Sequence, residues 1–202
     1  MTQIFPAAAA VVLCLAACSP EPAGPSGNAQ ALPAETNGTA PVSPAPAPRP
    51  ARPGPPTPAA DVLTLEGLGS LRIGQAVPAG SGWAERGAQI SDECRLISSP
   101  DFPGVYAIVE GGRVRRITVG QRSDVKLVEG IGVGASEAEV RAAFAGFREE
   151  PHEYVEAPGK YLTAPNAPSG DPALRFEIGA DRRVSLIHVG TMPVLGYVEG
   201  CA

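Results

Sequence analysis

The 202-residue chain is poor in aromatic, charged and histidine side chains. Aromatic residues make up 5% of the sequence and charged residues 18%, and there are only 2 histidines, at positions 152 and 188. Two histidines so far apart do not have the spacing of a metal site. The excess of 21 acidic over 16 basic residues gives a net charge of -5, which argues against a nucleic acid as partner.

Motifs typical of enzymes are also missing. The sequence has no Gly-x-Ser-x-Gly segment, which would form the nucleophile elbow of a serine hydrolase. A glycine-rich stretch at 130–134 has neither the Lys-Ser/Thr pair of a phosphate-binding loop nor the glycine spacing of a dinucleotide site. We therefore predict a protein that is not an enzyme and that has no cofactor and no metal.

No apolar run is long enough to span a membrane. The longest run, Ile4–Ala16, has 13 residues, whereas a spanning helix needs roughly 20; its length is typical of a signal peptide. The run leads into Leu15-Ala16-Ala17-Cys18, which resembles a bacterial lipobox. This resemblance implies that residues 1–17 are a lipoprotein signal peptide and that Cys18 is the lipidated first residue of the mature chain. An ordinary secretory signal is the alternative.

Proline is unevenly distributed. Of the 23 prolines, 13 lie at 19–60. Proline fixes φ and removes a backbone donor, and bulky apolar side chains are nearly absent here, so we predict a disordered Pro/Ala-rich tether over 18–60. Extended as polyproline II, this tether would reach on the order of 130 Å. Ser19, rather than Asp, follows Cys18, which by analogy with enteric sorting favours the outer membrane.

The remaining residues, 61–202, contain two similar stretches. Val105–Gly120 aligns with Leu174–Gly190, and each consists of two β-rich runs around a glycine-containing turn, which predicts a hairpin. Short segments with a shared glycine, Leu71–Gly74 and Ile131–Gly134, precede them at corresponding places. We therefore predict a duplicated domain, with repeat one at about 61–125 and repeat two at about 126–202.

The second repeat has a clear helix signal. Ser136 and Glu139 form a capping box, and Val140, Phe144 and Phe147 fall on one face at helical spacing. In the first repeat, proline and glycine at 75–86 allow only a short, weak helix. The predicted fold is α+β: two repeats, each a short helix packed on a three-stranded antiparallel meander. The first meander strand would lie at 94–98 in one repeat and at 154–163 in the other.

The leading segments Leu71–Gly74 and Ile131–Gly134, together with the two predicted hairpins, resemble the BamE/SmpA-type lipoprotein fold. The folded part is also similar to a family of uncharacterised proteobacterial lipoproteins, which share four segments found here at Gly67–Gly74, Ser136–Arg141, Pro151–Tyr154 and Tyr197–Cys201. The resemblance implies a periplasmic lipoprotein built from two BamE/SmpA-like repeats.

The 4 cysteines divide between the leader and the domain. Cys14 would leave with the signal peptide and Cys18 would carry the lipid, so Cys94 and Cys201 remain as a pair in an oxidising compartment. A disulfide between them would close a loop of over 100 residues, worth roughly 4–5 kcal/mol in the chain-entropy model. We expect it to join the C-terminal tail to the first repeat.

Four residues are candidates for ligand binding: His152, Tyr154, Lys160 and Tyr161. A histidine flanked by Glu and Tyr could be a ligand or a general base, although a loop histidine that caps backbone groups is the alternative. The two tyrosines flank a Pro/Gly turn and are expected to be partly exposed. His188 aligns with a threonine of the first repeat and is expected at a surface or edge position.

Arginines suggest a candidate anion patch at Arg113, Arg115 and Arg116, together with Arg122. Such a patch could bind an anionic glycan or a phospholipid headgroup. The alternative is the solvated face of an edge hairpin, which discourages pairing between sheets.

We thus predict an outer-membrane lipoprotein facing the periplasm that acts as a non-enzymatic binding or scaffolding module. Its expected partners are the membrane, through lipid (palmitate) on Cys18, and an envelope protein, peptidoglycan or a glycan. Two alternatives remain. One is a carbohydrate-binding, lectin-like protein that uses Tyr154, Tyr161 and His152, and the other is a hydrolase centred on His152.

Overall fold

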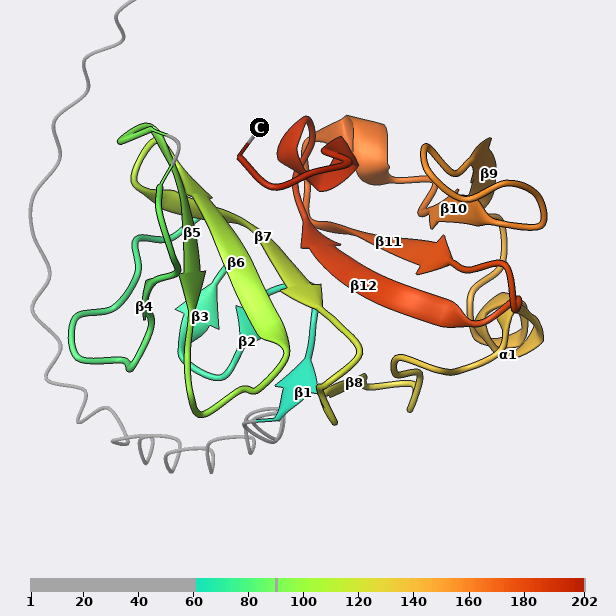
Figure 1. The fold of residues 1–202 in the computed structure, drawn as a ribbon, viewed down its shortest axis with the longest axis horizontal. Helices are drawn as coiled ribbons and strands as arrows, with labels where there is room; N and C mark the ends of the chain where they lie inside the picture. Colours follow the sequence, from blue (N-terminus) through green and yellow to red (C-terminus); the bar gives the residue numbers. More distant parts are fainter. Residues whose placement is uncertain (1–60, 90, 202) are drawn as a thin grey trace, which may run out of the picture. The chain divides into compact units, whose positions relative to one another are not determined.

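The computed structural model describes residues 61–89 and 91–201 (Figure 1). The predicted signal peptide at 1–17, the lipidation site Cys18 and the tether at 18–60 lie outside the described residues. Within the described part of the chain, no helix has the length and apolar character needed to cross a membrane.

The domain is built around one antiparallel sheet of eight strands, in the order β4-β5-β6-β7-β12-β11-β10-β9 (Figure 1). The strands of the first half are β4 (Ala84–Glu85), β5 (Cys94–Ser98), β6 (Val105–Glu110) and β7 (Arg113–Val119). Those of the second half are β9 (Arg148–Pro151), β10 (Lys160–Thr163), β11 (Ala173–Ile178) and β12 (Val184–Gly190). Each half is therefore a four-stranded meander, and β7 pairs with β12 to join the halves.

The seam between the halves requires close backbone approach. Thr118 of β7 pairs with His188 of β12, and Gly190 pairs with Arg116. A Cβ atom on Gly190 would collide with the carbonyl oxygen of Arg115 and lie 2.9 Å from the Cα of Arg116. Only glycine fits here, because real Cβ atoms do not approach backbone atoms this closely.

The two halves repeat one contact between their leading segments and their hairpins. In the first half the N–H of Gly74 donates to the carbonyl of Val114 at 2.7 Å, and in the second half the N–H of Gly134 donates to the carbonyl of Val184 at 2.8 Å. These are the positions that the sequence alignment matches.

Short elements cover one face of the sheet. They are α1 (Glu137–Ala143), the parallel pair β1 (Val62–Leu63) and β8 (Lys126–Leu127), and the hairpin of β2 (Gly67–Leu68) and β3 (Leu71–Arg72). Their apolar side chains, including Leu63, Leu68, Leu71 and Val140, pack into a core with Ile117, Phe176 and Ile187 of the sheet. The 3-10 helices η1 (Ala167–Ser169) and η2 (Val194–Gly196) complete the described elements.

The predicted α+β fold of two helix-plus-meander repeats is wrong, because the described chain is mostly β-structure with a single α-helix. The first half has no helix after its leading segment. Gly80 and Gly82 there adopt φ angles of +70° and +75°, outside the helical region, and Pro78 lacks a backbone donor. This segment runs as coil into β4.

The predicted capping box is confirmed, but the helix is shorter than its apolar spacing indicates. Ser136 Oγ accepts from the N–H of Glu139 at 3.3 Å, and the Glu139 carboxylate accepts from the N–H of Ser136 at 2.7 Å. The helix ends at Ala143, and Phe144 is already extended. Phe144 and Phe147 instead pack their rings against Phe176 at centroid distances of 5.6 and 5.7 Å.

The predicted hairpins are observed as β6–β7 and β11–β12, and the predicted strand at 94–98 is β5. The strand predicted at 154–163 covers only Lys160–Thr163, because the preceding residues form a loop. The outer strands β4 and β9 were not predicted.

Candidate functional site

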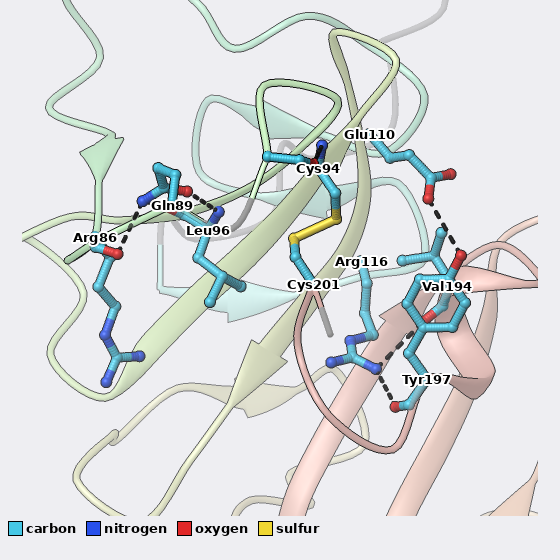
Figure 2. Close-up of a disulfide and its surroundings, with 10 residues drawn as sticks. Arg86, Gln89, Cys94, Leu96, Glu110, Arg116, Val194, Tyr197 and Cys201 are labelled. Atoms are coloured by element: carbon cyan, nitrogen blue, oxygen red, sulfur yellow. Dashed lines mark hydrogen bonds between the residues drawn. A yellow bond between two sulfur atoms is a disulfide. The ribbon is translucent and has the colours of Figure 1, made fainter.

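The C-terminal segment 191–201 packs against the sheet, with Leu195 in the main core and Val194 and Cys201 in a second, smaller cluster. The expected disulfide joins Cys94 of β5 to Cys201, with their Cα atoms 5.6 Å apart (Figure 2). Cys201 is buried and forms a small apolar cluster with Ile108 and Val194. The covalent bond therefore fixes the end of the chain to the first half of the sheet.

Arg116 lies beneath this tail and is 1% exposed. Its guanidinium donates to the carbonyl of Val194 at 3.2 Å and to the carbonyl of Tyr197, whose hydroxyl in turn donates to Glu110 at 3.2 Å (Figure 2). Burial lowers the pKa of Arg116 below its ordinary value. Arg116 is thus an internal tie between the sheet and the tail.

The structure does not gather the predicted anion patch. Successive side chains of a strand point to opposite faces, so Arg115 and Arg116 diverge, and Arg116 is buried. Arg113 is exposed, and its guanidinium donates to the carbonyl of Gly74 at 2.8 Å. In the second half Arg183 donates to the carbonyl of Gly134 at 2.7 Å. Arg113 and Arg183 therefore each join the leading segment of their half to its hairpin.

His188 lies at the centre of the sheet and is 2% exposed, so its expected position at a surface or edge is wrong. Its Nε2 is 3.0 Å from Oε1 of Glu177, and its Nδ1 is 2.9 Å from Oγ1 of Thr118. Burial lowers the pKa of His188 to about 4, which makes the ring neutral at pH 7. A neutral imidazole has one N–H, so Nε2 donates to the carboxylate and Nδ1 accepts from the threonine hydroxyl.

His152 reaches the second oxygen of the same carboxylate. Its Nε2 lies 3.3 Å from Oε2 of Glu177, and its Nδ1 accepts from the backbone N–H groups of Tyr154 at 3.1 Å and Val155 at 3.3 Å. Burial acts to raise the pKa of Glu177, but the hydrogen bonds with His188 and His152 act against it, and the pKa is lowered. Glu177 is therefore an ionised carboxylate between two imidazoles.

Thr118, His188 and Glu177 together have the hydroxyl–imidazole–carboxylate order of a hydrolase triad. However, Thr118 has no exposed surface, so in this arrangement a substrate carbonyl has no access to its hydroxyl. The three groups satisfy one another's hydrogen bonds within a buried layer. We interpret them as a structural polar network, because such buried groups need partners to offset their loss of water.

Of the four predicted ligand residues, the structure brings His152 and Tyr161 together. Their rings stack at a centroid distance of 4.6 Å. Tyr161 is 3% exposed, and the guanidinium of Arg175 lies 4.0 Å from its ring centroid. Both rings are thus largely covered, and the inner surface of this stack offers no free platform for a sugar.

Tyr154 and Lys160 take other directions. Tyr154 is 65% exposed and its hydroxyl donates to Glu199. Lys160 pairs with Glu137 of α1 at 3.1 Å and with Glu149 of β9 at 3.2 Å. Lys160 therefore joins the helix to the sheet and does not converge with the other three candidates on one ligand.

A pocket of about 420 Å³ that the sequence did not indicate lies in the first half of the domain. Its lining includes Arg86, Ser98, Phe102, Tyr106, Gln121 and Arg122. The guanidinium of Arg86 sits 5.4 Å from the ring centroid of Tyr106. These residues come from three separate stretches of the chain, at 86, 98–106 and 121–122. Each is ordinary in its local sequence, so no sequence signal marked them as a group.

Comparison of the chain with models of known families, with curated proteins and with solved structures gives no match. The likeness to BamE/SmpA-type and other proteobacterial lipoproteins therefore stays a prediction from the motifs.

Proposed function

We propose that this protein is an outer-membrane lipoprotein that faces the periplasm and acts as a non-enzymatic binding or scaffolding module. The observation that carries the proposal is the disulfide between Cys94 and Cys201. Disulfides form and persist in oxidising compartments such as the bacterial periplasm. This agrees with the compartment that the lipobox-like segment ending at Cys18 implies.

The polar network supports a binding module over a hydrolase centred on His152. The imidazole of His152 does reach a second titratable group, Glu177 at 3.3 Å. Both of its ring nitrogens are engaged, however, and only 7% of its side chain is exposed. A general base needs a free nitrogen within reach of a substrate proton, and here both nitrogens serve the fold.

Of the three residues predicted for a carbohydrate-binding protein, Tyr154 is exposed, whereas Tyr161 is buried and His152 is stacked on it, so the three form no shared surface for a sugar. The pocket around Arg86 and Tyr106 is a different surface of suitable size for a small ligand.

Lipidation at Cys18 tests the proposal. We expect the wild-type chain to incorporate labelled palmitate and to fractionate with the outer membrane. Cys18→Ser should be unlabelled and no longer membrane-bound, while Cys14→Ser, a matched control in the leader, should behave as wild type. Membrane attachment and unchanged mass of Cys18→Ser would contradict the proposal.

A further inference from the structure

The pocket in the first half contains two arginines without carboxylate partners. Within residues 61–89 and 91–201, neither Arg86 nor Arg122 forms an ion pair. Both side chains are exposed, and both line the pocket. Two positive charges at one hollow of an acidic protein favour an anionic ligand.

The second half of the sheet has a place that corresponds to this pocket, and there the charged side chains pair with one another. The seam pair Thr118 and His188 sets the correspondence between halves. Tyr106 pairs with Thr118, and Arg175 pairs with His188, so Tyr106 and Arg175 occupy corresponding positions. The next strand outward extends this correspondence to Ser98 and Thr163, which pair with Tyr106 and Arg175 respectively.

Glu150 provides a carboxylate at this place in the second half. One of its oxygens accepts from the hydroxyl of Thr163 at 3.2 Å and lies 3.7 Å from the guanidinium of Arg175. Glu150 stands two residues after Arg148, which pairs with Thr163.

Arg86 occupies the equivalent position in the first half. It stands two residues after Ala84, which pairs with Ser98. The first half therefore has a guanidinium where the second half has a carboxylate. Glu150 pairs with Arg175, whereas Arg86 lies over the neutral ring of Tyr106, and no described carboxylate pairs with Arg86. An external carboxylate would give Arg86 a partner.

The rest of the lining favours a sugar as the carrier of that carboxylate. Phe102 and Tyr106 contribute aromatic surface, which packs against the apolar faces of sugar rings. Ser98 and Gln121 contribute a hydroxyl and an amide that can both donate and accept. Arginine is suited to bidentate recognition of carboxylates.

We propose that this pocket binds a carboxylate-bearing sugar, with Arg86 and Arg122 on the carboxylate and the ring against Phe102 and Tyr106. The inference deepens the proposed function by naming the ligand class. It rests on that function only for the compartment, the periplasm, in which the protein would meet such a ligand. The volume of the pocket, about 420 Å³, lies within the usual range of small-ligand sites.

The pocket has a built-in reporter. Trp83 is the only tryptophan of the chain, and its ring stacks on Phe102 at a centroid distance of 5.7 Å. Ligand contact with Phe102 should therefore change the tryptophan fluorescence. The full-length chain, purified in detergent, would be titrated with N-acetylmuramic acid and with N-acetylglucosamine, which differ by the carboxylate-bearing lactyl group, and likewise with glucuronic acid and glucose.

We expect at least one of the two acidic sugars to bind at least tenfold more tightly than its neutral counterpart. Arg86→Gln and Arg122→Gln should each weaken binding at least tenfold. Arg113→Gln, an exposed arginine outside the pocket, is the matched control and should bind as wild type. Thermal melts of the variants would show which of them fold, and either pocket variant alone suffices for the comparison.

Three results would overturn the inference: no binding of either acidic sugar, equal binding of each acidic sugar and its neutral counterpart, or unchanged affinity in both pocket variants. Acetate binding as tightly as the acidic sugars would also overturn it, because it would show a site for simple anions. None of these results alters the lipidation of Cys18, so a failure of the sugar assignment is distinguishable from a failure of the proposed function.

Discussion

Acidification should destabilise this domain through His188. The imidazole is buried in the middle of the sheet and held neutral between Thr118 and Glu177. Its pKa is lowered from 6.5 to about 4, chiefly by burial. The unfolded chain therefore binds this proton below pH 6.5, whereas the folded chain binds it only below about pH 4.

The sign and size of the effect follow from proton linkage. The contribution of neutral His188 to the free energy of unfolding is fully present above pH 6.5. It is lost as the pH falls toward 4, because the unfolded state binds more protons than the folded state in that window. The full shift corresponds to roughly 3 kcal/mol, and about 2 kcal/mol of it should be lost between pH 7 and pH 5. Glu177, whose pKa is lowered from 4.5, contributes in the same direction but at lower pH.

Urea unfolding of the full-length Cys18→Ser chain at pH 7 and pH 5 measures this loss. In His188→Gln the amide can donate to Glu177 and accept from Thr118 without titrating, so the loss between the two pH values should shrink by about 2 kcal/mol. His152→Gln removes the other histidine and serves as the matched control, which should keep the loss. Because the chain has only 2 histidines, that variant also gives a single histidine resonance whose NMR midpoint reports His188 directly.

A midpoint near 6.5 would refute the reasoning, as would an undiminished loss of stability in His188→Gln. Either result would mean that the imidazole is not held neutral by burial.

Replacing both cysteines of the disulfide by serine should lower the free energy of unfolding by about 4 kcal/mol, seen as a fall in melting temperature. A variant that melts at the same temperature as the oxidised wild type would contradict the role of the bond. Gly190→Ala should cost about 3 kcal/mol or more in urea unfolding, because its Cβ meets the backbone of β7. Gly111→Ala, with open space but φ at +58°, should cost about 1 kcal/mol, and equal losses would argue against the tight seam. Arg116→Met should speed limited proteolysis of the C-terminal tail, whereas Arg115→Met should leave that rate nearly unchanged, and matching rates would show that Arg116 does not hold the tail.

Local signals in the sequence were sufficient for the hairpins and the helix cap. The β6–β7 and β11–β12 pairs follow from alternating β-formers around glycine turns, and the Ser136–Glu139 capping box needs only four residues. The cysteine pair could be predicted from the leader, because only Cys94 and Cys201 remained.

The helix-plus-meander repeat could not be predicted correctly, because helical spacing is not unique to helices. Phe144 and Phe147 fit an apolar helix face, yet they serve an aromatic cluster with Phe176 after the helix has ended. The strands β4 and β9 are short and exposed, and their polar residues show no periodicity that marks a strand.

Buried polar residues were the other source of error. Arg116 and His188 alternate with apolar residues in β7 and β12, a pattern typical of strands with one solvated face. That face is covered by the tail at 191–201 and by the polar network, which involve residues distant in sequence. Burial of this kind depends on tertiary contacts that the pattern of a single strand does not contain.

The central claim, that an oxidised domain is carried on a lipid anchor, is tested most directly by the intact mass of the mature chain from the envelope. We expect a protein that begins at Cys18, carries acyl chains on that residue and gains two hydrogens on reduction, from opening the bond between Cys94 and Cys201. A chain that retains residues 1–17, or an unacylated chain with both thiols free, would contradict the account.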